Sequence, residues 1–224
     1  MNEDRHAPDQ QSILAFMTTE HFTLQTARGA ANAEISSRLQ LFVTSLSGTI
    51  VTLALAAQLS GLGTVFRIFA LILLPTLYLL GVMTLLRILQ STDEWRIYGQ
   101  GMARIRHYFL ELAPQMRRYF VLPSTDDPWA NLGVVGIRTA WWQGLLTSGA
   151  LIIALDSIVG GSFIGLLVSM VTPRAVAVPL VSGVVGLLVS AIALYEAQRR
   201  IFRRHIASVP AMFPPDPKTD DETA

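Results

Sequence analysis

Four long apolar stretches constrain this chain more than any other feature. They lie near residues 39–59, 65–86, 142–163 and 176–195. A helix that crosses the hydrocarbon core of a bilayer needs about 20 mostly apolar residues. Soluble helices seldom stay apolar on every face for that length. The sequence therefore predicts an all-α, polytopic membrane protein with four transmembrane helices.

Composition narrows the function classes. Of the 224 residues, 51% are hydrophobic and 15% are charged, and the net charge of +1 gives no electrostatic footprint for nucleic acid. Cysteine is absent, which excludes disulfides, cysteine-ligated zinc, iron–sulfur clusters and thiol nucleophiles. The sequence contains no HExxH, GxSxG, Walker A or GxGxxG motif. We therefore expect a protein that is not an enzyme and has no cofactor, metal or nucleic-acid partner.

The basic residues predict the orientation in the membrane. Arg67 and Arg174 lie at the two short connections, and the other 15 of the 17 lysines and arginines lie in the termini and the middle connection. Because positive charge stays on the cytoplasmic side, both termini and the middle connection should be cytoplasmic. The first apolar stretch begins far from the N-terminus, so we expect no cleaved signal peptide.

Changes in composition divide the chain into five expected segments. The tail, rich in proline and acidic residues, buries too little surface to offset its ordering entropy. The segments are a flexible N-terminus at 1–17, a cytoplasmic helix with two spans and an amphipathic helix at 18–120, a linker at 121–141, two spans with a basic end at 142–206, and a disordered tail at 207–224. Thr18 or Thr19 is the expected cap of the first helix. Pro114 should kink or end the amphipathic helix, because proline lacks a backbone N–H donor.

A periodic seam marks the middle connection. Its large apolar residues recur at alternating spacings of three and four, as on one face of a helix that Thr92 or Asp93 would cap. The seam comprises Trp95, Tyr98, Met102, Ile105, Phe109 and Leu112. It has three candidate partners: the chain's own residues 20–38, a second copy, or the membrane surface.

Small residues form rows at i, i+4 spacing in two of the predicted spans. The first row is Thr44, Gly48, Thr52 and Ala56, and the second is Ser182, Gly186 and Ser190. Small residues let helix backbones approach closely in lipid. The rows fit packing inside one four-helix bundle, or alternatively a subunit interface or a polar pore lining. The first span is the better pore candidate.

Asp156 is the one acidic residue well inside a predicted span. Intramembrane acids are often functional. If the third span starts at Trp142, Asp156 lies about 21 Å further, in the outer half of the bilayer. Three interpretations remain open. The span ends there, with a bend at Gly160 and Gly161 and a separate piece at 163–171; or Asp156 handles ions or protons; or it pairs with Arg67 or Arg174.

A basic cluster follows the fourth span. It contains Arg199, Arg200, Arg203 and Arg204. Glu196 precedes Arg199 and Arg200 by three and four residues, a spacing at which side chains on a helix can form ion pairs. Such a cluster attracts anionic lipid headgroups. The alternative is a plain topology signal.

Two segments carry a family resemblance. They read TEHFTLQTAR at residues 19–28 and YGQGMARIRHYF at 98–109. With these motifs, and with 16 arginines against one lysine, the chain resembles a family of uncharacterised four-span membrane proteins from high-GC bacteria. The resemblance implies no activity, but it implies a location in a bacterial inner membrane. It implies that the two cytoplasmic helices form a defining module, packed on each other.

These observations lead to two expectations about function. The first is a homo-oligomeric interaction or assembly component of the membrane, with the lipid bilayer and an unidentified membrane or cytoplasmic protein as partners. The alternative is a small oligomeric ion channel or pore-forming effector lined by the first span, with Asp156 or Arg67 near its outer mouth.

Overall fold

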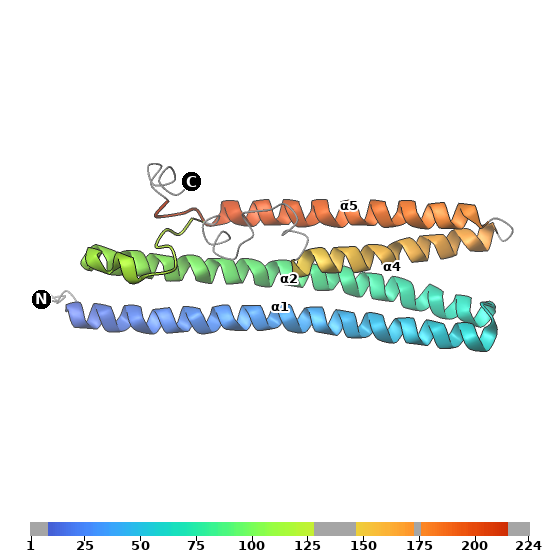
Figure 1. The fold of residues 1–224 in the computed structure, drawn as a ribbon, viewed down its shortest axis with the longest axis horizontal. Coiled ribbons are helices and arrows are strands. Elements are labelled where there is room, and N and C mark those ends of the chain that lie inside the picture. Colours follow the sequence, from blue (N-terminus) through green and yellow to red (C-terminus); the bar gives the residue numbers. More distant parts are fainter. Residues whose placement is uncertain (1–8, 128–146, 173–175, 215–224) are drawn as a thin grey trace, which may run out of the picture. The chain divides into compact units, whose positions relative to one another are not determined.

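The chain is all-helical where the structure describes it. This computed structural model describes residues 9–127, 147–172 and 176–214, in which no strand occurs. Its helices are α1 (Gln10–Ser60), α2 (Thr64–Leu112), the short 3-10 helix η1 (Pro114–Tyr119), α4 (Ser148–Val171) and α5 (Ala177–Ser208) (Figure 1). The four α-helices are long and apolar enough to cross a membrane. The predicted all-α, four-span fold of a multi-pass membrane protein is thereby confirmed.

Helix α1 begins earlier than predicted, at Gln10. The side chain of Asp9 caps it by accepting the backbone N–H of Ser12 at 2.8 Å. Thr18 and Thr19 lie inside the helix, and their hydroxyls donate to backbone carbonyls four residues earlier. The expected caps are therefore wrong. The N-terminal segment that is expected to be flexible is helical in its second half, because neither proline nor glycine interrupts the helix there. The first eight residues lie outside the described part of the chain.

Helix α2 joins the second span and the seam without a break. The expected separate start at Thr92 or Asp93 is wrong, since the backbone stays helical from Thr64 to Leu112 and even contains Pro75. Of the two predicted effects of Pro114, a kink or an end, the structure shows the end: the helix stops just before Pro114, and η1 follows. A turn at residues 61–63 connects α1 to α2, and its Gly61 has a positive φ of 58°.

Helix α4 corrects two interpretations of the third span. Thr147 caps it by accepting the N–H of Ala150 at 3.2 Å, and the helix continues through Asp156 to Val171. The helix therefore does not end at Asp156, and residues 163–171 are not a separate piece. Glycines in this helix instead allow close contact with α5. The expected span start at Trp142 lies outside the described residues.

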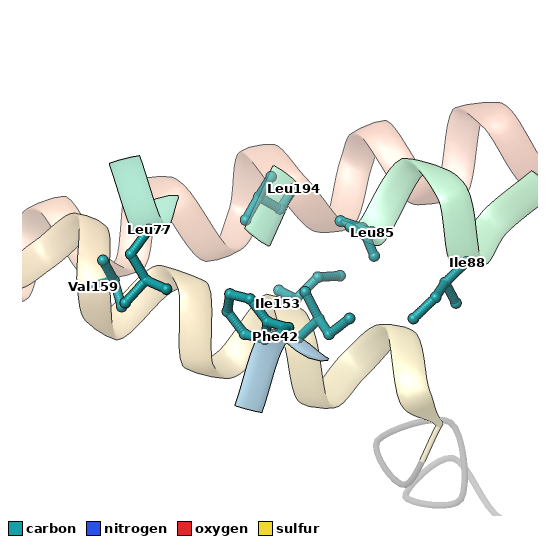
Figure 2. Close-up of a cluster of buried hydrophobic side chains, with 8 residues drawn as sticks. Phe42, Leu77, Leu85, Ile88, Ile153, Val159 and Leu194 are labelled. Carbon is teal, nitrogen blue, oxygen red and sulfur yellow. The ribbon is translucent and has the colours of Figure 1, made fainter. Parts of the chain in front are cut away.

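The described residues form two compact units. Unit 1 comprises residues 9–32, 93–127 and 206–214, and unit 2 comprises 33–92, 147–172 and 176–205. Helices α1 and α2 contribute to both units. The core of unit 2 draws on all four α-helices, whose buried side chains point toward one another (Figure 2). These side chains are Phe42, Leu77, Leu85, Ile88, Ile152, Ile153, Val159 and Leu194.

Candidate functional site

The two resemblance motifs contact each other in unit 1. A Cβ atom added at Gly101 would lie 2.9 Å from Leu24 Cδ1, and one at Gly99 would lie 3.5 Å from Arg28 Cζ. Glycine at position 101 of α2 therefore lets the Leu24 side chain of α1 lie directly against the backbone of α2, whereas the distance at Gly99 is an ordinary van der Waals contact. This contact favours the interpretation that the seam packs on the chain's own residues 20–38.

The seam residues differ in burial. Met102 and Ile105 are buried at its centre, whereas Trp95, Tyr98 and Phe109 are half-buried. Leu112 is exposed at the C-terminal end of α2. The central side chains are therefore not free to meet a second copy or a membrane surface.

Two arginines of unit 1 have no acidic partner among the described residues. The guanidinium of Arg28 lies 3.9 Å from the centre of the Trp95 ring, and the Arg106 side chain is only 8% exposed. Within the described residues, the Nε atoms of both arginines are buried and have no hydrogen-bond partner. Burial lowers the pKa of Arg28. Burial and then the nearby charge of Arg28 lower the pKa of Arg106.

A buried polar network extends from another face of α2. Arg96 Nη2 lies 2.7 Å from Asp93 Oδ1, and Arg96 Nη1 donates to Gln100 Oε1 at 3.1 Å. Gln100 in turn donates to the backbone carbonyl of Asp126 at 2.9 Å. Arg104 Nε lies 2.7 Å from the Asp126 carboxylate, which is fully buried. These bonds satisfy the buried polar groups that they join and hold the segment after η1 on α2.

Asp126 also binds the segment after α5. Its carboxylate accepts the backbone N–H groups of Met212 at 2.9 Å and Phe213 at 2.7 Å, and the Phe213 ring stacks on His107 at 3.9 Å. Burial alone would raise the pKa of Asp126, but these two N–H groups and Arg104 together hold it below its usual value. Residues up to 214 are thus placed by specific bonds, which corrects the expectation of disorder from residue 207. The rest of the predicted tail, and residues 128–141 of the predicted linker, lie outside the described residues.

Asp156 is buried within unit 2 and exposes none of its surface. Both carboxylate oxygens lack a hydrogen-bond partner among the described residues, and a Cβ atom at Gly81 would collide with the carboxylate. The expected position near water is therefore wrong. Asp156 does not pair with Arg67, which is exposed; Arg174, the other expected partner, lies outside the described residues.

The small residues of α5 pack inside unit 2. Gly186 and Ser190 are buried and Ser182 is half-buried. Ser190 shares a 2.9 Å hydrogen bond with the Tyr78 hydroxyl. A Cβ atom at Gly186 would lie 2.6 Å from Ile164 Cδ1. This row belongs to the bundle.

Sequence reasoning missed a close contact between α4 and α5. A Cβ atom at Gly161 would lie 2.6 Å from the Gly183 carbonyl oxygen, and one at Gly165 would lie 3.1 Å from the Pro179 carbonyl oxygen. Gly161 and Gly165 have the small-xxx-small spacing that brings membrane helices together. That spacing is the signal that could have identified the contact.

The row in α1 behaves differently. Thr44, Gly48 and Thr52 are exposed, and only Ala56 is buried. A Cβ atom at Gly48 would meet nothing within 4 Å, and the Thr52 hydroxyl donates to the Gly48 carbonyl at 2.8 Å. The first three members therefore lie on a face of α1 that the described part of the chain leaves uncovered. Packing within one bundle does not account for them.

An apolar cavity of about 460 Å³ lies between α1, α2 and α4 in unit 2. Leu53, Leu74 and Leu166 are among its lining residues, with Thr49, Ser162 and Ser169 as the hydroxyl-bearing ones. The lining suits an apolar occupant and offers no charged group for catalysis.

The basic cluster of α5 is partly neutralised. Glu196 lies 3.1 Å from Arg199 and 4.0 Å from Arg200. Arg203 and Arg204 are exposed. Those two are the members best placed to attract an anionic surface.

Within the described residues, no group of three or more histidine, aspartate or glutamate side chains could hold a metal ion. Comparison of the chain with protein-family models, with curated proteins and with solved structures gives no match.

Proposed function

We propose that this protein is a non-enzymatic assembly component of a bacterial inner membrane and forms homo-oligomers through the exposed face of α1. The interface would be centred on Thr44, Gly48 and Thr52. Positive residues place both termini on the cytoplasmic side in this proposal. Unit 1 would then be available to a cytoplasmic protein partner.

The observation that carries the proposal is the mismatch between polarity and burial in α1. We compare the most apolar stretch of each of the four spans. The stretch of α1 has the lowest mean hydropathy, yet only 11% of it is buried, against 33% of the stretch of α4. A span rich in Ser, Thr and Gly gains little from facing lipid, because lipid stabilises apolar side chains there. Small residues instead favour contact with another helix. A second copy of α1 supplies such a helix.

The same face supports a second candidate, an oligomeric channel. A ring of subunits would turn Thr44, Ser47 and Thr52 toward a shared axis, and all three are exposed on α1. Asp156 would not belong to that pore, since it is buried in its own subunit. The channel proposal therefore depends on the hydroxyl-bearing face of α1 alone.

The test is the substitution Gly48→Leu in full-length protein reconstituted into lipid discs. Space around Gly48 is open, so the subunit should fold normally while the larger side chain separates neighbouring helices. We expect the oligomer to dissociate or change its size, as measured by mass photometry. The matched control is Ala193→Leu, at an exposed position of α5, which should leave the oligomer intact.

Ion flux into liposomes separates the two candidates. For a channel, wild-type protein conducts, and Thr44→Leu or Thr52→Leu alters the flux. For an assembly component, wild-type liposomes hold their ion gradient although the oligomer forms. If the particles formed by Gly48→Leu and by wild type have the same mass, the proposed α1 interface is wrong both for the assembly component and for the channel.

A further inference from the structure

The apolar cavity of unit 2 has a closed floor and an open rim. Its floor consists of Ala70 and Leu77 of α2 and Val159 of α4, which expose 1%, 3% and 4% of their surface. Its rim includes Ile50 of α1 and Ile158 of α4, which are both more than half exposed. Within the described residues, the cavity therefore opens at the surface of unit 2, between α1 and α4.

This opening lies in the membrane-spanning part of the helices. The lining residues of α1 and α2 fall within the apolar stretches at 39–59 and 65–86, and the others belong to α4, which is also long and apolar enough to cross a membrane. At this depth, the surface of a spanning helix faces the hydrocarbon of the bilayer. The molecules that can reach the opening are therefore those dissolved in the membrane, above all its lipids.

The chemistry of the lining favours a hydrocarbon. The described residues that line the cavity include no charged side chain, and their polar side chains are the three hydroxyls of Thr49, Ser162 and Ser169. An ionic headgroup would lose its hydration there without a compensating charge. An empty apolar cavity is unfavourable too, because its lining atoms lack partners for dispersion contacts. Such cavities take up apolar molecules.

The shape of the cavity favours an extended chain over a compact ring. Its lining runs from Phe66 to Leu77 along α2 and from Ile158 to Ser169 along α4. At the rise of an α-helix, each of these stretches is about 16 Å long. A volume of about 460 Å³ spread over that length makes a narrow space that follows the helices. The acyl chains of a bilayer lie in the same general direction as the helices that cross it.

We propose that this cavity is a lipid site, which binds one acyl chain of a membrane phospholipid and leaves the headgroup outside. The chain would enter between α1 and α4 and contact all three helices, so that it helps to hold α1 on the rest of unit 2. The lining does not include Thr44, Gly48 or Thr52. The lipid site therefore does not depend on the proposed oligomer.

Native mass spectrometry of the full-length protein in detergent micelles tests the site. The probe is dioleoyl-phosphatidylcholine, added to protein that has been washed free of bound lipid. We expect wild type to bind one lipid per subunit in a saturable step. Ser162→Phe and Thr49→Phe fill part of the cavity and should bind this lipid at least about tenfold more weakly, since expelling two buried methylene groups already costs that factor. Val184→Phe, at an exposed position of α5 outside the lining, is the matched control and should bind as wild type does.

A second lipid distinguishes an acyl-chain site from a headgroup site. Phosphatidylglycerol with the same two acyl chains should bind wild type as tightly as phosphatidylcholine does, because the chain alone enters the cavity. A tenfold or greater preference for either headgroup would overturn the proposal. So would equal binding of phosphatidylcholine to Ser162→Phe, Thr49→Phe and wild type.

A measurement on wild type alone covers the case in which both cavity variants fail to fold. Phosphatidylcholine with a photoreactive diazirine in one acyl chain is added at one lipid per subunit, and crosslinked peptides are identified by mass spectrometry. We expect crosslinks to residues 66–77 and 158–169, and an excess of unlabelled lipid should abolish them. Crosslinks that fall mainly on the exposed residues of α5 would overturn the proposal.

The other possible occupants give different results. If Ser162→Phe changes the number of copies in the particle, a second copy of the chain fills the cavity instead. If wild type retains a bound molecule of another mass that phosphatidylcholine does not displace, the occupant is not an acyl chain. Either result overturns the lipid site. A wild-type monomer that binds one lipid would refute the proposed oligomer and leave the lipid site standing.

Discussion

The guanidinium of Arg28 lies 3.9 Å from the ring centre of Trp95, and this contact joins α1 to α2 within unit 1. Arg28 ends the first resemblance motif, and Trp95 begins the seam. Among the described residues Arg28 has no carboxylate partner, and the contact with Trp95 explains why its side chain can nevertheless be half-buried. The ring supplies part of the electrostatic stabilisation that an acid would otherwise provide.

A double-mutant cycle should measure this contact. We expect Trp95→Leu and Arg28→Met to be coupled by about 0.5–2 kcal/mol in the free energy of unfolding, as for other cation–π pairs. Chemical unfolding in detergent micelles gives the four values of the cycle. Strictly additive effects would show that the ring and the guanidinium do not interact.

Asp126→Asn should loosen the segment after α5. The amide keeps the size of the side chain but removes the charge that faces Arg104 and the N–H groups of Met212 and Phe213. We expect a loss of about 2 kcal/mol in the free energy of unfolding and faster amide exchange at both positions. Glu20→Gln, at an exposed position of α1, is the control and should change neither. Unchanged exchange at Met212 would rule out this role for Asp126.

The same contact should respond to acid. Because the pKa of Asp126 is lower in the folded protein than in the unfolded chain, its stabilisation is complete above the unfolded value of about 3.9. It disappears as the pH falls through the lower folded value. Amide protection of Phe213 should therefore decrease over this acidic range in wild type but stay low in Asp126→Asn. A protection profile with the same pH dependence in both proteins would contradict the assignment.

Gly81 and Asp156 should be coupled in stability. A methyl group at position 81 would run into the Asp156 carboxylate, so Gly81→Ala should be destabilising by about 1–3 kcal/mol. Adding Asp156→Ala should recover part of that loss, since the smaller side chain makes room. Thermal unfolding of the two single variants and the double variant tests this. If Gly81→Ala unfolds as wild type does, the Asp156 carboxylate does not hold its position against Gly81.

The four-span fold could be predicted because span length and apolar composition are local properties of the sequence. The long-range contacts of unit 1 could not. Asp126 binds the backbone of Phe213, 87 residues further along the chain, and no periodic pattern marks either partner. Composition alone therefore predicts disorder for residues 207–214.

The small-residue rows show the same limit. The rows in α1 and α5 have equal spacing in the sequence, yet Gly48 is exposed and Gly186 is buried. Spacing identifies helices that are able to pack closely, but only the assembled bundle decides which face is used. Gly161 and Gly165 did carry a readable signal for the α4–α5 contact.

The mass of the wild-type protein in native-like lipid discs tests the central claim most directly. The account predicts several copies of this chain in one particle, and a shift to a smaller mass for Gly48→Leu but not for Ala193→Leu. A wild-type monomer, or a complex with a different protein at one copy each, would contradict homo-oligomerisation through α1.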